Sequence, residues 1–295
     1  MSADHEKSSD RPLAPGLYLV ATPIGNLEDI TLRALRVLRS VDRIACEDTR
    51  QTQKLLNHFE IHTPTVSYHQ HNEGERAEEL IAELKLSARI AVVSDAGTPG
   101  IADPGGQIAA AAITAGIDVF PVPGANAAIS GLIASGLPIE QFVFHGFLPA
   151  KAGQRKTALE ELIRGSAAHV FYEAPHRILD TLADLEAVFG PSQHVVIARE
   201  LTKLHEEFLR GPVGALRAQL TTRASVRGEI VLMLALSPTE STSQKKRDSI
   251  AVEVAALMKS EGIGEMDALK RVARERGIGK SEAYRELQRE QNRLR

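Results

Sequence analysis

The chain has 295 residues, of which 43% are hydrophobic and 25% are charged, as is typical of a soluble globular protein with a sizeable core. This length favours two domains over one. No apolar run approaches the roughly 18 residues that cross a membrane, and the first fifteen residues lack the apolar segment of a signal peptide. We therefore expect a cytoplasmic protein, and the single cysteine, Cys46, agrees with a reducing compartment.

The formal net charge of -3 is unevenly distributed along the chain. Residues 245–295 contain 13 Lys and Arg against 9 Asp and Glu, whereas residues 1–244 contain 22 against 29. An acidic body with a basic tail favours a polyanionic partner.

The first half of the chain alternates strand-like and helix-like segments. Strands are expected at residues 16–22, 41–46, 63–68, 90–94 and 117–122, and helices at residues 30–40, 49–59, 76–85 and 107–116. Such alternation predicts a largely parallel, wound sheet. The sequence PVPG at residues 121–124 then breaks the pattern, and a helix of small residues is expected at 125–137.

The second half continues in the same style and ends in a polar segment. Strands are expected at residues 141–147, 167–174, 193–200 and 228–236, with helices at residues 157–164, 176–189 and 213–220. Short basic helices follow. The predicted organisation is a disordered N-terminus (1–14), two α/β domains (15–122 and 123–237), a linker (238–248) and a helical extension (249–295).

The most informative stretch is residues 92–105, VVSDAGTPGIADPG, where a buried strand stops in a loop of turn-forming residues. In open α/β sheets, ligands bind beside the carboxyl ends of the strands, where such loops lie. The alternative is an ordinary connection between a strand and a helix, but such connections run to only about 2 to 6 residues. The loop is therefore predicted to build a binding site.

Several common signatures are absent, which narrows the chemistry. No G-x-G-x-x-G follows the first strand, no G-x-S-x-G occurs, and the Gly-Lys-Ser at residues 279–281 lacks the first glycine of a P-loop. His69 and His71, with Glu73 nearby, have no further Cys or His cluster to support them. No metal site is therefore predicted.

Five segments, at residues 21–35, 47–56, 94–105, 171–178 and 198–207, together resemble the tetrapyrrole methylase superfamily, and within it the enzymes that methylate ribosomal RNA. The resemblance runs in order from residue 16 to 236 and resumes in the basic tail. It implies two α/β domains with S-adenosylmethionine bound in the cleft between them, and a homodimer. It also implies methylation of the ribose 2′-hydroxyl of a cytidine near the decoding centre of small-subunit RNA, with that RNA or the 30S subunit as partner.

The resemblance also implies which residues contact the cofactor. These residues are Pro23, Ile24, Asp95, Ala96, Gly97, Thr98, Ile101, Asn126, Ala127, Tyr172, Glu200 and Leu201. Backbone amides, small side chains and an apolar slot suit a zwitterionic ligand that carries an adenine and a sulfonium cation. Tetrapyrrole methylases usually have Gly-Asp-Pro in this loop, whereas Thr98 stands in the middle position here, which favours another substrate.

Aligning two reactants in a dry cleft supplies much of the rate of a methyl transfer, and a base that accepts the hydroxyl proton can assist. The candidate bases are Asp95, Glu173 and His176, which follow predicted strands. Each has a structural alternative: Asp95 as a cap of the next segment, Glu173 as the ion-pair partner of Arg177 four residues on, and His176 as a cover for the start of a helix.

RNA phosphates are expected to meet cations in polar loops and near strand ends. The candidates in the body are Arg50, Arg177, Arg199 and Lys203, and those in the tail are Lys270, Arg271, Arg274 and Lys280. The tail resembles a small helix-turn-helix unit, and a solvated helical extension is the alternative. Two other functions stay open at this point: methylation of a tetrapyrrole or another small molecule, and a non-catalytic role in ribosome assembly.

Overall fold

The computed structural model describes residues 12–69, 72–103, 105–162, 167–236, 250–276, 283–285 and 287–288. The chain divides into two compact units, Met1–Leu236 and Ser237–Arg295. The predicted linker at 238–248 and most of the predicted disordered N-terminus lie outside the described residues. The predicted division of the body between residues 122 and 123 stays a prediction.

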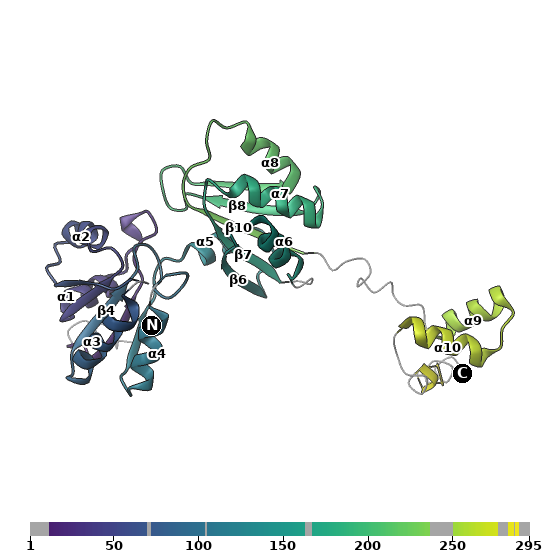
Figure 1. Ribbon diagram of the computed structural model, residues 1–295, viewed down its shortest axis with the longest axis horizontal. Helices are drawn as coiled ribbons and strands as arrows, with labels where there is room; N and C mark the ends of the chain where they lie inside the picture. Colours follow the sequence, from purple (N-terminus) through teal and green to yellow (C-terminus); the bar gives the residue numbers. More distant parts are fainter. Residues whose placement is uncertain are drawn as a thin grey trace, which may run out of the picture. The chain divides into compact units, whose positions relative to one another are not determined.

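The first sheet has five strands in the order β3-β2-β4-β1-β5, and every pairing is parallel, as the alternation predicted. The strands are β1 (Gly16–Val20), β2 (Arg43–Cys46), β3 (Thr65–Ser67), β4 (Arg89–Val93) and β5 (Val119–Val122). The helices around them are η1 (Leu27–Asp29), α1 (Leu32–Ser40), α2 (Thr49–His58), α3 (Glu73–Lys85) and α4 (Gly106–Thr114), as Figure 1 shows.

Both faces of this sheet are buried, because successive strand side chains point to opposite faces. On β1, Tyr18 and Val20 pack into a core with α1 and α2, whereas Leu17 packs into a second core with α3 and α4. Helix α1 buries Ala34 and Leu38, one turn apart, and its N-terminus is capped where the Ala34 amide donates to the Thr31 hydroxyl at 3.0 Å.

The second sheet has the order β6-β7-β10-β8-β9 and is mixed. Its strands are β6 (Phe142–Phe147), β7 (Ala168–Glu173), β8 (His194–Arg199), β9 (Glu207–Pro212) and β10 (Ile230–Ala235). Only β6 and β7 are parallel; the other three pairings are antiparallel. The sequence did not indicate β9, because it follows β8 after a turn rather than a helix, and β10 then enters between β7 and β8.

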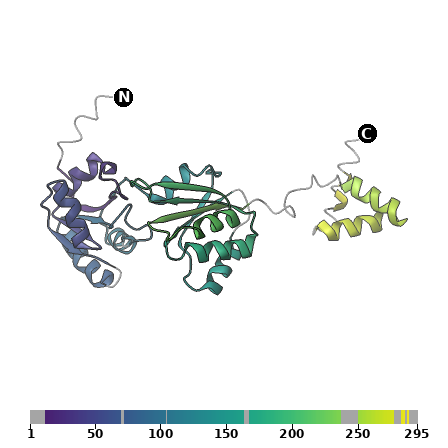
Figure 2. The same ribbon diagram turned by 90° about the horizontal axis from the view of Figure 1, so that it is seen from above.

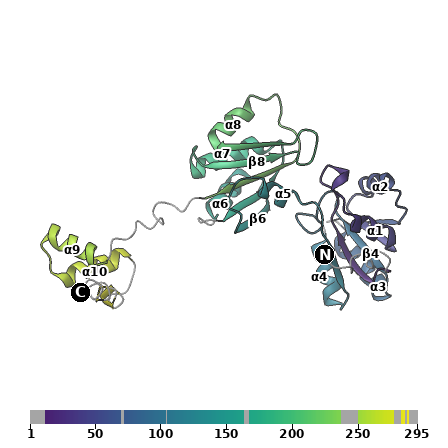
Figure 3. The same cartoon turned by 180° about the vertical axis from the view of Figure 1, so that it is seen from behind.

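Four helices cover the two faces of the second sheet (Figures 1 and 3). Helix α5 (Ala127–Ile133) packs on one face against side chains of β7, β8 and β10. Helices α6 (Ala152–Glu160), α7 (Ile178–Phe189) and α8 (Val213–Thr221) pack on the other face. A buried ion pair, with Arg155 Nε 2.6 Å from Asp184 Oδ2, joins α6 to α7.

The C-terminal unit has its own small core. Helices α9 (Ile250–Glu261) and α10 (Glu265–Arg276) lie side by side (Figure 2). They pack together through Val254, Leu269 and Val272, and Leu287 joins them from the next helical residues. Among the described residues, no helix has both the length and the apolar character needed to span a membrane.

Candidate active site

Three loops meet at the carboxyl edge of the first sheet because parallel strands end on the same side. The turn after β1 and the loop after β4 are joined by two backbone hydrogen bonds between Thr22 and Gly97, of 2.8 and 3.1 Å. The Thr98 hydroxyl donates to the carbonyl of Ala125, in the turn after β5, at 3.1 Å. These contacts fix the loop after β4 between its two neighbours.

At two positions in the loop after β4, neighbouring atoms come so close to the backbone that only glycine fits without strain. Gly97 has a φ of 85°, and a Cβ atom there would lie 3.2 Å from Ile24 Cγ2. Gly105 has a φ of 138°, and a Cβ atom there would lie 3.1 Å from the amide nitrogen of Gly100. Ala102, which has a Cβ, also has a positive φ of 64°. Such a backbone costs about 1 to 3 kcal/mol and is typical of functional loops.

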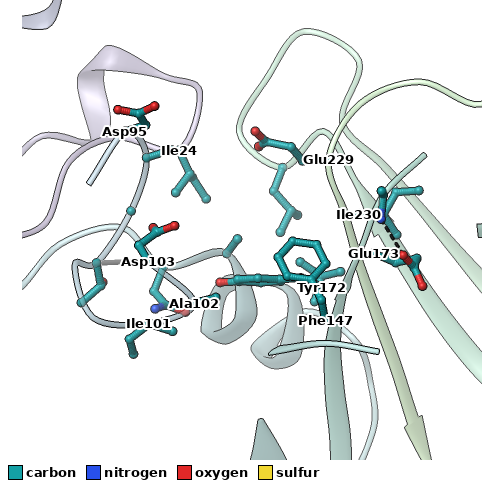
Figure 4. A pocket seen from close by; sticks show the side chains of 18 of the residues that line it. Ile24, Asp95, Ile101, Ala102, Asp103, Phe147, Tyr172, Glu173, Glu229 and Ile230 are labelled. Carbon is teal, nitrogen blue, oxygen red and sulfur yellow. Dashed lines mark hydrogen bonds between the residues drawn. The ribbon is translucent and has the colours of Figure 1, made fainter. Parts of the chain in front are cut away.

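A cavity of about 430 Å³ opens beside these loops, and residues of β7 and β10 line its other side (Figure 4). Ten of the residues predicted to contact a cofactor line it: Ile24, Asp95, Ala96, Gly97, Thr98, Ile101, Asn126, Ala127, Tyr172 and Leu201. Pro23 and Glu200 are not among the lining residues. The Glu200 carboxylate instead accepts the backbone amide of Glu229 at 3.1 Å. The volume is that of a typical small-molecule site.

Several lining residues were missed from the sequence. They are Glu47, Ala102, Asp103, Phe147, Ala174, Pro175, Glu229, Ile230 and Val231. Glu47 directly follows β2, so the rule that ligands lie at strand ends was sufficient to find it. Nothing in the sequence placed Phe147 or Glu229, because their position depends on the order of strands in the second sheet.

Besides Glu173, the acidic residues that line the cavity are Glu47, Asp95, Asp103 and Glu229. Figure 4 shows the carboxylates of Asp103 and Glu229 pointing toward its interior, whereas that of Asp95 points away from it. Burial raises the pKa of Asp103 to about 6, with a further contribution from the charge of Glu47, although a hydrogen bond with Ser94 opposes the shift. Burial and the charge of Asp95 also raise the pKa of Glu47. The cavity is therefore partly desolvated and anionic, which suits a cationic ligand.

Lys203 forms ion pairs with two carboxylates at the outer edge of this acidic cluster. Its Nζ lies 3.0 Å from Glu200 Oε1 and 3.2 Å from Glu229 Oε2. Its side chain packs so closely on Gly25 that a Cβ atom there would lie 2.4 Å from Lys203 Cγ. Lys203 therefore connects the first turn to the loop after β8. This engagement within the molecule argues against the predicted contact with RNA.

Of the three predicted bases, only Asp95 lines the cavity with a carboxylate that remains accessible. Asp95 is exposed and accepts the amide of Asp48 at 3.1 Å. The carboxylate of Glu173 faces away from the cavity (Figure 4), where it accepts the Ala174 amide at 2.8 Å and the Thr181 hydroxyl at 2.5 Å.

Glu173 also lies 3.3 Å from the guanidinium of Arg177, which is the ion pair that its spacing allowed. Its carboxylate is thus fully used at the start of α7. His176 is exposed and does not line the cavity. Neither residue is retained as a candidate base.

Two more of the predicted RNA contacts are engaged within the molecule. Arg177 donates to the carbonyls of Leu148 and Pro149 at 2.7 and 3.1 Å. Arg199 lies 3.0 Å from Glu207 and donates to the carbonyl of Arg227. Their side chains are only 20% and 17% exposed, so these two predictions are not retained.

The remaining cations are more accessible. The Arg50 side chain is 87% exposed, although it pairs with Asp48 at 2.9 Å. On α10, Lys270 and Arg271 are exposed, and Lys270 lies 2.8 Å from Asp267. Arg274 is in the same helix, but its side chain is outside the described part of the structure, as is the whole of Lys280.

Comparison with known proteins gives concordant matches. The family model for tetrapyrrole (corrin/porphyrin) methylases matches residues 16–217. A ribosomal RNA small subunit methyltransferase I from Halalkalibacterium halodurans is 48% identical, over 91% of this chain and 93% of that protein. The protein of the same name from Synechocystis sp. is 45% identical, over 91% and 95%. The crystal structure of uroporphyrin-III C-methyltransferase from Thermus thermophilus, complexed with S-adenosylhomocysteine, has a TM-score of 0.52 at 16% identity, covering 75% of this chain and 97% of that chain.

The two sheets have the fold of the tetrapyrrole methylases. The chain belongs to that family and, within it, to the ribosomal RNA small subunit methyltransferase I proteins, because the identity is high over nearly the full length of both chains.

Proposed function

We propose that the protein uses S-adenosylmethionine to methylate the ribose 2′-hydroxyl of a cytidine in the decoding region of 16S ribosomal RNA. The observation that carries the choice of substrate is the 48% identity, over 91% of the chain, to a protein named for small-subunit ribosomal RNA methylation. The particular nucleotide and the ribose oxygen come from the family resemblance of the sequence motifs. A ribosomal substrate also places the protein in the cytoplasm.

The residues of the cavity fit the cofactor in shape and charge. Ile24, Tyr172 and Leu201 supply an apolar slot for an adenine, and the loops at 95–98 and 126–127 supply backbone polar groups. The carboxylates of Asp95 and its neighbours match a ligand with both a sulfonium and an ammonium group. When bound, the cofactor supplies a methyl group on a positively charged sulfur.

The contribution of the chain is binding, orientation and the exclusion of water. Holding the two reactants in line converts a bimolecular step into an effectively unimolecular one, which is worth on the order of 7 to 11 kcal/mol in well-oriented systems. The rigid pairing of Thr22 with Gly97, and of Thr98 with Ala125, provides a preorganised wall for such a site.

The charges on the first domain suggest where RNA lies. Helices α1 and α2 contain no acidic residue and five Lys and Arg residues, namely Arg33, Arg36, Arg39, Arg50 and Lys54. Helix α3, on the opposite face of the sheet, contains five acidic and two basic residues. Helix α2 begins at Thr49, two residues after Glu47, which lines the cavity. We therefore place phosphates along the α1–α2 face and along the basic C-terminal unit.

A homodimer is part of this proposal. Exposed large apolar side chains gather on α5, on the segment after it and on the edge strand β6; they are Ile129, Ile133, Ile139, Phe142, Val143 and Phe147. An unpaired edge strand with apolar side chains favours association with another chain. In analytical ultracentrifugation we expect the wild type to sediment as a dimer and the double variant Ile133→Lys/Phe142→Lys to sediment as a monomer. A wild type that sediments as a monomer would contradict the proposed homodimer.

In the direct test, the purified protein is incubated with S-adenosylmethionine that carries a labelled methyl group. The methyl acceptor is either 30S subunits, protein-free 16S RNA or a porphyrinoid. We expect label in the RNA, mapped by mass spectrometry to one ribose 2′-oxygen of a cytidine. Label in the porphyrinoid alone would favour the small-molecule hypothesis. Absence of cofactor binding in calorimetry would favour a non-catalytic assembly factor.

A further inference from the structure

We propose that Asp103 is the general base that accepts the proton of the attacking hydroxyl group. This inference rests on the proposed function and names a residue for it. The sequence motifs did not single out Asp103 as a base, and its place in the cavity is what points to this role.

The fold aims the Asp103 side chain into the cavity. Gly100 and Gly105 approach each other closely at the base of the loop after β4, and Ala102 has a positive φ. In Figure 4 the Asp103 carboxylate lies within the cavity on the side opposite Tyr172. Burial raises the pKa of Tyr172 and the charge of Asp103 adds to the rise, which agrees with this placement.

The surroundings keep Asp103 basic, and no cation of the described residues forms an ion pair with it. The charged groups that act on it are the carboxylates of Glu47, Asp95 and Glu229, and a hydrogen bond with Ser94 partly opposes their effect on its pKa. Lys203 is directed instead to the outer side of Glu229. A carboxyl group with a pKa of about 6 is ionised at neutral pH yet is a better proton acceptor than an ordinary aspartate.

The other carboxylates of the cavity are less suited to this role. Asp95 is exposed and already accepts the amide of Asp48. The Glu229 side chain is 74% exposed and is paired with Lys203. Glu47 interacts with His69, whose charge opposes the rise in its pKa.

The reaction balances with Asp103 as the only added group. The hydroxyl oxygen forms a bond to the methyl carbon, and its proton passes to the Asp103 carboxylate. The carbon–sulfur bond breaks with its electron pair left on sulfur. The products are a methyl ether, a neutral thioether and a protonated Asp103, which then returns its proton to the solvent.

The first experiment compares Asp103→Asn with Asp118→Asn, an exposed aspartate just before β5, at the opposite end of the strands. We expect Asp103→Asn to lower kcat for RNA methylation by roughly 10²- to 10⁴-fold, the usual contribution of a general base. Affinity for S-adenosylhomocysteine, which lacks the sulfonium charge, should stay within about threefold in calorimetry. Asp118→Asn should match the wild type in both measurements.

The pH profile gives a sharper readout. For the wild type we expect kcat/KM to fall with decreasing pH through about 6, the pKa of Asp103 in the free enzyme. Among the neighbouring charges, Glu47 raises the pKa of Asp103 most, so in Glu47→Gln this fall in kcat/KM, the acid limb, should move to lower pH. In Asp103→Asn the limb should disappear from the residual activity.

A third readout needs no ligand. Asp103 ionises near 3.8 in an unfolded chain and at about 6 in the folded one, so its ionisation destabilises the fold as pH rises between these values. Asp103→Asn should therefore have a higher melting temperature than the wild type above about pH 6, and an equal one near pH 4. A folded, more stable variant without activity would separate catalysis from folding.

The outcomes are distinct. If Asp103→Asn methylates RNA within about threefold of the wild type, with the same acid limb, Asp103 is not the base and the proposed function stands. If the wild type transfers no methyl group to RNA, the proposed function fails, and the assignment of Asp103 fails with it.

Discussion

At the scale of single residues, the loop after β4 contains two features that cost free energy of folding. Gly97 and Gly105 have backbone angles that other residues rarely adopt, and Asp103 is a partly buried carboxyl group near other negative charges. Neither feature stabilises the fold. Both become useful only if the cavity binds a ligand, because strain and desolvated charge preorganise a site before the ligand arrives.

Gly97→Val tests the wall of the cavity. We expect at least a tenfold decrease in S-adenosylmethionine affinity in calorimetry, because a Cβ atom at residue 97 would press on Ile24 and shift the loop. The positive φ should also cost about 1 to 2 kcal/mol of stability.

Gly116→Val is the matched control for this variant. Gly116 has a φ of 71°, but no atom lies within 4 Å of a Cβ placed there. This variant should therefore have a similar cost in backbone strain and keep the affinity of the wild type. Equal affinities for Gly97→Val and the wild type would remove this loop from the cofactor site.

Glu207 provides a pH-dependent contribution to stability. Hydrogen bonds with Arg223 lower the pKa of Glu207 to about 2, and Arg199 adds to the effect. This stabilisation is complete above the unfolded pKa of 4.5 and disappears as pH falls toward 2. Urea denaturation should show Glu207→Gln less stable than the wild type by on the order of 1 to 2 kcal/mol at neutral pH. The difference should shrink steadily below about pH 4; a constant difference would contradict this ion-pair account.

At the scale of elements, the first sheet has helices of opposite charge on its two faces. Buried side chains of α1 and α2 form one core with β1 and β4, so the basic residues of these helices are left on the outer surface. Helix α3 turns Glu75, Glu78 and Glu79 outward on the other face, whereas its Glu73 is buried. A phosphate backbone is therefore attracted to one face and repelled by the other.

Charge reversal on α1 tests this surface. We expect Arg33→Glu/Arg36→Glu to weaken binding of 16S RNA fragments. The slope of the logarithm of the binding constant against the logarithm of the salt concentration should also become shallower, by about 0.7 for each phosphate that the variant no longer neutralises. Arg76→Glu/Lys85→Glu makes the same change in charge on α3 and should bind RNA nearly as the wild type does. Equal weakening in the two variants would indicate a general effect of net charge rather than a specific surface.

At the scale of the whole molecule, the body and the C-terminal unit have separate cores. Every residue that lines the cavity belongs to the first unit, Met1–Leu236. A chain that ends at Leu236 should therefore fold and bind S-adenosylmethionine with unchanged affinity. Its kcat/KM on 16S RNA should fall by roughly tenfold or more, because the basic side chains of the second unit no longer bind phosphate. Full activity of this truncated chain on RNA would contradict a docking role for the extension.

Much of the fold was accessible from the sequence because it depends on local patterns. The alternation of apolar strands and amphipathic helices predicted the parallel first sheet, and strand ends predicted the loop that lines the cavity. The second sheet was less accessible. Strand β9 has partly exposed residues and no helix before it, and the place of β10 between β7 and β8 is a pairing of distant segments that no local pattern encodes.

The sequence by itself determined the fold class, the family and most of one wall of the cavity, because glycines, turn residues and strand ends act locally. The tertiary structure decided which charges are available. It turned the carboxylate of Glu173 to Thr181 and the guanidinium of Arg199 to Glu207, and it gathered Glu47, Asp103 and Glu229 from three distant segments around one cavity. Burial and mutual repulsion arise only from that gathering, so the basicity of Asp103 has no counterpart in the sequence alone.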